Sequence, residues 1–207
     1  MKFPNATIII FAKAPELGKV KTRLATQLGE VVALDIYKQL LSETFCTVID
    51  ADVANVCCYS TDPNHSAFDQ WKEKGVCFYR QDGEDLGERM LNAFKLELKK
   101  ASSVLLLGTD CPVFEAHHFD EALSLLNVDT QAVVIPTEDG GYVLMGLNQQ
   151  CSEQHDHLFK NIAWSTEYVL EQTLDIFKQL NIGWEQLETL WDVDNASDYQ
   201  RWKSINN

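Results

Sequence analysis

The sequence predicts an α/β fold: a doubly wound, mainly parallel sheet with helices on both faces. The first observation is that short apolar runs alternate with segments of helical periodicity along the whole chain. The second is that residues 7–12 are continuously apolar or β-branched, as expected for a central strand covered on both faces. With 207 residues and 45% hydrophobic content, the chain is expected to form a single domain over residues 1–207.

The first half of the chain alternates between strands and helices. After the strand at 7–12, Leu34, Tyr37, Leu41, Phe45 and Val48 recur at helical spacing, and strand character returns at 53–60. The pattern then predicts a helix near 63–74, a short strand near 76–80, a helix over 85–100 and a strand over 104–107.

The second half continues the alternation. It predicts a helix near 114–126, a strand over 132–136, an apolar strand-like segment over 142–147 and a helix from about 165 to 180, closed by Asn181 and Gly183. Residues 149–163 carry the weakest signal and are predicted to form a loop.

Bulk properties exclude several classes of function. Seventeen Lys and Arg against 31 Asp and Glu give a net charge of -14, which disfavours nucleic-acid or anionic-membrane binding. No apolar stretch approaches the roughly 20 residues that a membrane-spanning helix needs, and the N-terminus lacks the pattern of a signal peptide. Six cysteines without a Cys-x-x-Cys pair fit a reduced, cytoplasmic protein.

Open α/β sheets bind ligands beyond the carboxyl ends of their strands, so the residues after Ala12, Leu107, Pro136 and the last strand are expected to converge. The loop after Ala12 carries four cations and a glycine, namely Lys13, Gly18, Lys19, Lys21 and Arg23. This composition favours phosphate binding, the alternative being a solvated basic turn. The loop matches neither a Walker A motif nor a dinucleotide-binding fingerprint.

Aspartates follow two other strands. Asp110, in the motif Gly108-Thr109-Asp110-Cys111-Pro112, is a candidate ligand for a divalent cation, or else a helix cap. Asp192 and Asp194, two residues apart, would share one face of an extended chain and could complete a metal site, or else form a surface turn in which Asp194 or Asn195 caps the last helix.

Two further segments are candidates. In the turn around Asp139, Gly140 and Gly141, the aspartate either closes a tight hairpin or faces a ligand as a hydrogen-bond acceptor or base. Asp85 and Glu88 predict a capping box at a helix start, and Arg89 behind them is a weaker candidate for contact with the nucleotide or acceptor. The five histidines show no metal-ligand spacing and are interpreted as surface residues, with His117 and His118 pointing in different directions.

Six segments in order resemble the DUF2064 family of glycosyltransferase-A-like proteins, which belongs to the nucleotide-diphospho-sugar transferase superfamily: FAKAPELGKVKTRL, DLGERM, LLLGTDCP, EDGGYVLMGL, the Trp164-Ser165-Thr166 helix start and DVDNASDY. The family is distantly similar to molybdenum-cofactor and 2-phospholactate guanylyltransferases. The chain departs from the glycosyltransferase-A pattern because one carboxylate, Asp110, replaces Asp-x-Asp, and its first loop has fewer glycines than that of the nucleotidyltransferases.

The resemblance implies Mg²⁺ or Mn²⁺ at Asp110 with Asp194 or Asp192. It implies a nucleotide held by Ala12, Lys13, Gly18, Lys19, Lys21, Arg23, Arg89 and Thr109, and a sugar or acceptor at Asp139, Gly140, Gly141, Tyr142 and Trp164. The expected activity is glycosyl transfer from a nucleotide sugar to a small-molecule acceptor, with Asp139, Lys21 and Arg23 as catalytic residues. The alternatives are nucleotidyl transfer from a nucleoside triphosphate to a phosphorylated acceptor, and a non-catalytic nucleotide sensor.

Overall fold

One seven-stranded sheet organises the chain, in the order β3-β2-β1-β4-β6-β5-β7. The computed structural model describes residues 1–153 and 155–205. The strands are β1 (Ala6–Ala12), β2 (Asn55–Ser60), β3 (Cys77–Arg80), β4 (Ser103–Leu107), β5 (Ala132–Pro136), β6 (Tyr142–Asn148) and β7 (Trp184–Gln186). All neighbouring strands are parallel except at β6, which runs antiparallel to both β4 and β5. The mainly parallel sheet expected from the sequence is therefore observed.

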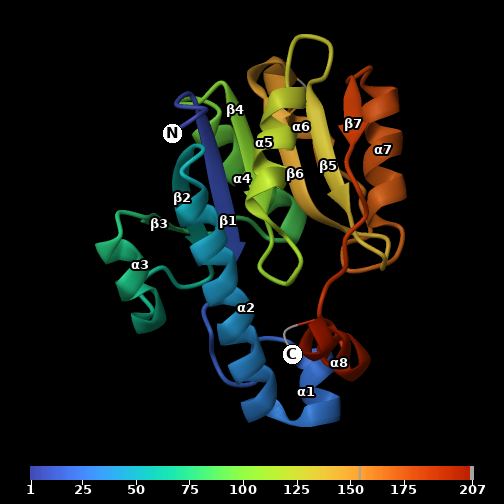
Figure 1. Ribbon diagram of the computed structural model, residues 1–207. Coiled ribbons are helices and arrows are strands. Elements are labelled where there is room, and N and C mark those ends of the chain that lie inside the picture. Colours follow the sequence, from blue (N-terminus) through green and yellow to red (C-terminus); the bar gives the residue numbers. More distant parts are fainter. Residues whose placement is uncertain (154, 206–207) are drawn as a thin grey trace.

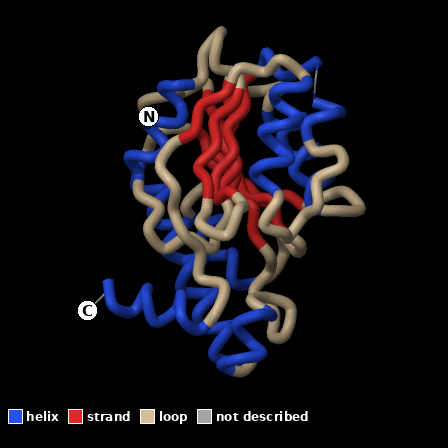
Figure 2. Tube along the Cα trace, turned by 90° about the vertical axis from the view of Figure 1, so that its right-hand side faces the viewer, coloured by secondary structure: helices blue, strands red, loops and turns tan. Residues whose placement is uncertain are grey.

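Helices cover both faces of the sheet, as Figure 2 shows in a view along its edge. The helices are α1 (Thr22–Leu28), α2 (Glu30–Ala51), α3 (Asp69–Glu73), α4 (Leu86–Glu97), α5 (Ala116–Leu125), α6 (His155–Leu158), α7 (Val169–Gln179) and α8 (Ala196–Ile205), with 3-10 turns η1 (Ser66–Phe68) and η2 (Gln149–Glu153). Side chains of α2, α3 and α5 share one buried cluster, and those of α4, α6 and α7 share a second one on the opposite face.

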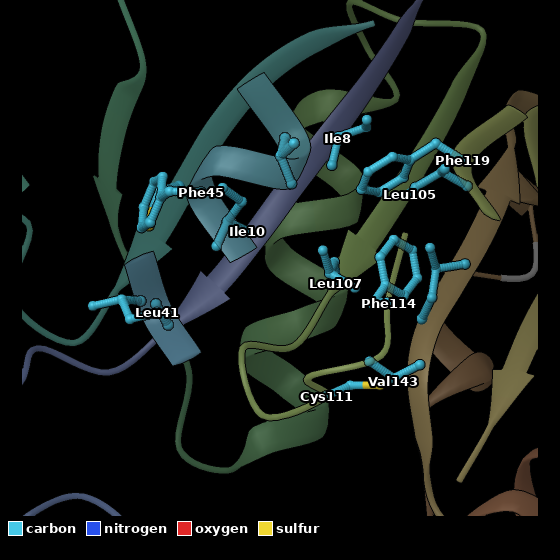
Figure 3. Packing of buried hydrophobic residues seen from close by; sticks show 14 of the residues in the cluster. Ile8, Ile10, Leu41, Phe45, Leu105, Leu107, Cys111, Phe114, Phe119 and Val143 are labelled. Atoms are coloured by element: carbon cyan, nitrogen blue, oxygen red, sulfur yellow. The ribbon is translucent and has the colours of Figure 1, made fainter. Parts of the chain in front are cut away.

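Alternation along the strands explains the two clusters. Ile8 and Ile10 of β1 point to the face covered by α2 and α5, whereas Ile9 between them points to the other face. Figure 3 shows the first face, where Leu105 of β4 packs beside Phe119 of α5. Both faces of β1 are thus buried, which is why its sequence is continuously apolar.

A third buried cluster lies beyond the carboxyl end of β1, where α1, α8 and the N-terminal half of α2 meet (Figure 1). Leu24 of α1 and Trp202 of α8 are buried there with Trp191 and Val193. The first and last helices of the chain therefore pack together close to the place where the sequence predicts the site.

Several elements differ from the prediction in their bounds or continuity. The helix expected over 63–74 is split into η1 and α3, and the loop expected over 149–163 contains η2 and α6. The helix expected from residue 165 begins at Val169, since Ser165 has a positive φ of 65°. Helix α1 is an additional short helix, which begins inside the basic loop and ends before the first helix expected around Leu34.

Candidate functional site

The loop after β1 is held rigidly at the carboxyl end of the sheet. The Tyr37 hydroxyl accepts a hydrogen bond from the Lys13 amide (2.9 Å) and donates one to the Lys13 carbonyl (2.8 Å). The Ala14 amide donates to Thr61 Oγ1 after β2 (2.9 Å). Gly18 has a φ of 74°, a left-handed conformation that glycine adopts readily. The loop is therefore a fixed platform in which Ala14 and Val20 are buried.

Lys21 is the cation that this loop turns inward. Its backbone is left-handed (φ 47°) at the start of α1, and its side chain is only 4% exposed. Nζ lies 3.0 Å from Asp110 Oδ2 and 3.5 Å from Asp194 Oδ1. Burial by itself lowers the pKa of this ammonium, but the carboxylates of Asp110 and Asp194 outweigh burial, so the net pKa is raised. Lys21 therefore stays charged at neutral pH.

Asp110 is presented at the end of β4, as expected, and it does not cap a helix. The residue that precedes the first turn of α5 is Glu115. Asp110 Oδ2 faces Lys21, whereas Oδ1 is buried and has no hydrogen-bond partner. A buried carboxylate oxygen without a partner is costly, and a bound cation would relieve that cost.

Residues 187–195, named here the C-terminal strap, bring the second carboxylate group to Asp110. The strap follows β7 and is held by backbone hydrogen bonds, among them those from the Leu190 amide to the Pro136 carbonyl (2.9 Å) and from the Val193 amide to the Asp110 carbonyl (3.0 Å). It carries Asp192 and Asp194 on either side of Val193, which is buried. The ends of β4, β5 and β7 therefore meet at one edge.

Asp192 and Asp194 differ in environment. Asp192 is half-buried, and its Oδ1 is buried and, like that of Asp110, has no hydrogen-bond partner. Burial, followed by the negative charge of Asp110, raises the pKa of Asp192 to about 8. Asp194 instead contacts cations through both oxygens, Oδ1 to Lys21 and Oδ2 to Arg23 (3.1 Å). Asn195, not Asp194, caps α8, because its Oδ1 accepts from the Ser197 amide.

The remaining cations of the loop lie farther out. Arg23 is exposed and also donates to the Ser165 carbonyl (3.4 Å). Lys19 is exposed and paired with Glu16 at 2.6 Å, so it does not contact the aspartates. Lys13 also has an exposed side chain. The structure thus brings Lys21 and Arg23, among the predicted nucleotide ligands, into direct contact with the predicted metal ligands.

The turn around Asp139 is a tight turn between β5 and β6. Asp139 Oδ1 accepts hydrogen bonds from Thr137 Oγ1 (2.6 Å) and the Gly141 amide (3.0 Å). Gly140 has a φ of 87°, and a Cβ there would meet the Glu167 carbonyl oxygen at 2.1 Å. The charge of Asp139 contributes to the raised pKa of Asp192, so this turn lies near the Asp192 carboxylate. Asp139 Oδ1 itself is used to hold the turn.

Other predicted ligands have structural partners. Arg89 Nε donates to the Gly83 carbonyl (2.9 Å), and Asp85 caps α4 by accepting from the Glu88 amide (2.8 Å). The Glu88 carboxylate accepts from the Glu84 amide, not from Asp85, so the expected capping box is incomplete. Trp164 packs against Gly87, where a Cβ would lie 2.6 Å from the indole nitrogen. Packing of this indole accounts for the glycine.

Tyr142, predicted to contact the sugar or acceptor, is turned into the interior. It packs against the cluster beneath α4, α6 and α7, and its hydroxyl is buried. Thr109 is buried too, and its side chain contacts the Tyr37 hydroxyl. Both side chains therefore contribute to the packing next to the site.

Sequence reasoning missed three residues that shape this region. Tyr37 looked like a core residue of α2, yet its hydroxyl fixes the loop after β1. Gln81 Nε2 donates to the carbonyls of Ala12 and Tyr59 (both 3.0 Å) and so ties the loop after β3 to the ends of β1 and β2. His118 is not a surface residue but is buried at 1% exposure. Its ring lies against that of His117, with centroids 3.9 Å apart, so the two rings do not point in different directions.

The residues present fit a hard divalent cation. Asp110 and Asp192 each offer a buried oxygen that no other group satisfies, and Mg²⁺ is commonly held by one or two carboxylates together with substrate phosphates and water. The three aspartates do not form a closed three-ligand cage. Within residues 1–153 and 155–205, the only group of three candidate ligands with all its atoms within 4.8 Å of one another is His117, His118 and Glu188.

A cavity of about 250 Å³ lies between α2 and the loop after β4. Gly108, Cys111 and Pro112 line it from the loop after β4, and Glu43 and Thr47 line it from α2. Leu107, at the carboxyl end of β4, and Phe114 also line it. No helix of the described chain is long and apolar enough to cross a membrane.

The fold of the chain is similar to solved structures of nucleotide-using transferases. A candidate nucleotide-diphospho-sugar transferase from Desulfovibrio desulfuricans G20 is 28% identical, with a TM-score of 0.82 over 93% of this chain and 83% of that one. A nucleotidyl transferase from Methanothermobacter (TM-score 0.67, 13% identity, 96% of each chain) shares the fold. So does a cytidylyltransferase from Leptospira borgpetersenii (TM-score 0.63, 16% identity, 97% and 86% of the two chains).

The family model described as "Uncharacterized protein conserved in bacteria (DUF2064)" matches residues 45–166, more than half of the chain. The matched part includes Asp110 and the Asp139 turn, and the loop after β1 and the C-terminal strap flank it. Together with the sheet order and the site at its edge, this match shows that the chain belongs to the DUF2064 family.

Proposed function

We propose that the protein is a transferase acting on a nucleotide-activated substrate, and that it is a metal-dependent glycosyltransferase that uses a nucleotide sugar and a small-molecule acceptor. One observation carries the proposal: buried Lys21 lies between Asp110 and Asp194, beside two unsatisfied oxygens, on Asp110 and Asp192. This pairing of a fixed cation with free carboxylate oxygens suits a diphosphate bridged to Mg²⁺ or Mn²⁺. The likeness to the Desulfovibrio transferase supports the same class of substrate.

In this proposal, different residues bind the metal ion, bind the phosphates and accept the proton. Asp110 and Asp192 would hold the cation, which when bound stabilises negative charge on the departing nucleoside diphosphate. Lys21 and Arg23 would bind phosphate oxygens, with Lys21 held by two carboxylates in the interior and Arg23 exposed at the surface beside Asp194. Asp139 would take a proton from the acceptor hydroxyl through Oδ2, because Oδ1 is engaged in the turn.

Nucleotidyl transfer is the second candidate. It is favoured by the direct contact between Lys21 and Asp110, since a lysine beside a metal-binding carboxylate is well placed to stabilise in-line attack on the α-phosphate. Several proteins that share the fold are nucleotidyl or cytidylyl transferases. In this reaction the acceptor would itself carry the attacking phosphate.

The two reactions release different products, which gives a direct test. The protein is incubated with sugar nucleotides or nucleoside triphosphates, Mg²⁺ or Mn²⁺, and a panel of sugar, phosphosugar and polyol acceptors. Acceptor-dependent release of nucleoside diphosphate supports glycosyl transfer, whereas release of pyrophosphate supports nucleotidyl transfer. Asp110→Asn should abolish either product and lose metal-dependent nucleotide binding while leaving the melting temperature nearly unchanged.

Two outcomes would refute the proposal. Tight, metal-dependent nucleotide binding with neither product, across the whole panel, would favour a nucleotide sensor. A large fall in melting temperature for Asp110→Asn, with nucleotide affinity retained, would show that the aspartate is structural.

A further inference from the structure

A second cluster of potential metal ligands lies away from the aspartates, at the start of α5. It combines His117 and His118 from the first turn of the helix with Glu188 from the C-terminal strap. His118 Nε2 lies 3.0 Å from Glu188 Oε1, and His117 Nε2 lies 3.8 Å from the same oxygen. One ligand atom from each of the three residues lies within 4.8 Å of the other two.

These separations are close to those of a zinc site. With bonds of about 2.0–2.1 Å, a tetrahedral ion holds its ligand atoms roughly 3.4 Å apart. The side chains of His117 (49% exposed) and Glu188 (63% exposed) can make the small adjustment, whereas His118 is 2% exposed and fixed. A rigid imidazole with two adaptable partners can therefore close around an ion without moving the helix.

The groups that contact Nδ1 of the two histidines are of the kinds that orient imidazole rings in metal sites. In metal sites the second ring nitrogen usually donates to a carboxylate or a backbone carbonyl. His117 Nδ1 lies 3.4 Å from Glu115 Oε2, and His118 Nδ1 lies 3.1 Å from the Glu115 carbonyl oxygen. Both rings thus have a partner that would leave Nε2 facing the third ligand.

His118 has two neutral tautomers, which differ in whether Nε2 presents a proton or a lone pair to Glu188. With the proton on Nε2, His118 donates to Glu188, and its Nδ1 accepts from the Glu115 amide at 2.9 Å. With the proton on Nδ1, the lone pair of Nε2 faces a carboxylate oxygen at 3.0 Å, which is repulsive unless a cation lies between them. Metal binding selects the second form, in which Nδ1 donates to the Glu115 carbonyl and no longer accepts from the Glu115 amide.

The charges also suit a divalent ion. A helix N-terminus repels cations, but the carboxylates of Glu115 and Glu188 add two negative charges at this place. Two imidazoles and one carboxylate form a borderline-soft ligand set, which binds Zn²⁺, Co²⁺ or Ni²⁺ better than Mg²⁺ or Ca²⁺. The cluster therefore differs in chemistry from the all-oxygen aspartate site.

We propose that His117, His118 and Glu188 form a second metal site, specific for Zn²⁺ and related transition ions, that joins α5 to the C-terminal strap. The site leaves at least one coordination position for water. It does not depend on the proposed function, because none of its residues belongs to the nucleotide or metal site at the sheet edge. Bound Zn²⁺ would tie the strap down four residues before Asp192.

The experiment measures Zn²⁺ uptake by the full chain without a polyhistidine tag, in excess Mg²⁺ to occupy all-oxygen sites, in competition with a chromophoric chelator. We expect one equivalent of Zn²⁺. His117→Ala and Glu188→Gln, both at exposed positions, should each weaken affinity by at least about tenfold to 100-fold, and Glu115→Gln by about tenfold. Co²⁺ should give an intense visible spectrum in the wild type that the first two variants lose.

Matched controls separate this site from others. His157→Ala and Glu185→Gln alter an exposed histidine and an exposed glutamate outside the cluster and should leave Zn²⁺ affinity unchanged. Asp110→Asn should do the same. Circular dichroism verifies that each variant is folded. A wild type that takes up no Zn²⁺, or Zn²⁺ affinity that His117→Ala and Glu188→Gln leave intact, would overturn the proposal.

Discussion

Replacing Lys21 with methionine should change nucleotide and metal binding in opposite directions. The substitution keeps the length and apolar stem of a side chain that is 4% exposed but removes its charge. Asp110 and Asp194 then lose the cation that lies 3.0 and 3.5 Å away from them. A phosphate loses a binding partner, whereas a metal ion gains carboxylates that no longer have a competing cation.

The expected magnitudes follow from the contacts. At an effective dielectric constant of about 20, two unit charges 4 Å apart interact by roughly 4 kcal/mol. Asp110 and Asp194 are 42% and 35% exposed, so water compensates much of this loss. We therefore expect about 1–2 kcal/mol of destabilisation. The loss of one hydrogen bond to a charged group, about 1.5–3 kcal/mol, should weaken nucleotide binding roughly ten- to 150-fold.

Two titrations test the argument. Calorimetry measures nucleotide affinity in saturating Mn²⁺, and electron paramagnetic resonance measures Mn²⁺ affinity without nucleotide, which should rise by at least about tenfold. Lys100→Met is the matched control, since Lys100 also pairs with a carboxylate at 3.0 Å, that of Glu97, but near the amino end of β4. Unchanged nucleotide affinity in Lys21→Met, or weaker Mn²⁺ binding, would refute the reasoning.

Three other predictions test the turn and the buried carboxyl group. Gly140→Ala should lower the free energy of unfolding in urea by at least about 2–3 kcal/mol, because the new Cβ would clash with the Glu167 carbonyl. Gly29→Ala is the control, since Gly29 has a similar φ of 88° but open space around it, and it should cost only about 1–2 kcal/mol. Equal losses in the two variants would contradict the clash. Asp139→Asn keeps an oxygen for the turn, so stability should change by less than about 0.5 kcal/mol while kcat falls about 10²- to 10⁴-fold, and unaltered kcat would exclude a role as base. Because the pKa of Asp192 is raised to about 8, the folded state holds this proton more tightly than the unfolded state. Without metal, stability should therefore fall between pH 5 and 8 by up to about 1.4 kcal/mol per unit relative to Asp192→Asn, and parallel pH profiles of the two proteins would show that Asp192 titrates normally.

The positions of the strands that are buried on both faces were predictable from the sequence. Strands β1, β4 and β5 are continuous apolar runs, so periodicity alone located them within a residue. The antiparallel direction of β6 was not predicted, because an apolar run has no direction; only the turn at Asp139 indicated a hairpin. Strand β7 has three residues and α1 has seven, too few for a periodic signal.

The candidate site was predictable to the extent that it depends on strand ends. Asp110 and the loop carrying Lys21 follow strands, and Asp192 lies in the strap that follows β7, so topology alone brings them to the carboxyl ends of the strands. Side chains that act from within apolar helical stripes were not predictable. Tyr37 occupies a core position of α2, and His118 meets a partner 70 residues away in sequence. Their roles depend on tertiary contacts that no local pattern encodes.

The C-terminal strap has a consequence for biosynthesis. Lys21 and Asp194 are separated by 173 positions, so the ribosome makes the lysine long before its partner. Contacts between such distant residues form late and slowly during folding. A nascent chain that lacks the strap has neither Asp192 nor Asp194, so Asp110 is then the carboxylate left to pair with Lys21. Competence to hold a ligand would therefore be acquired only after residues 187–195 have been made.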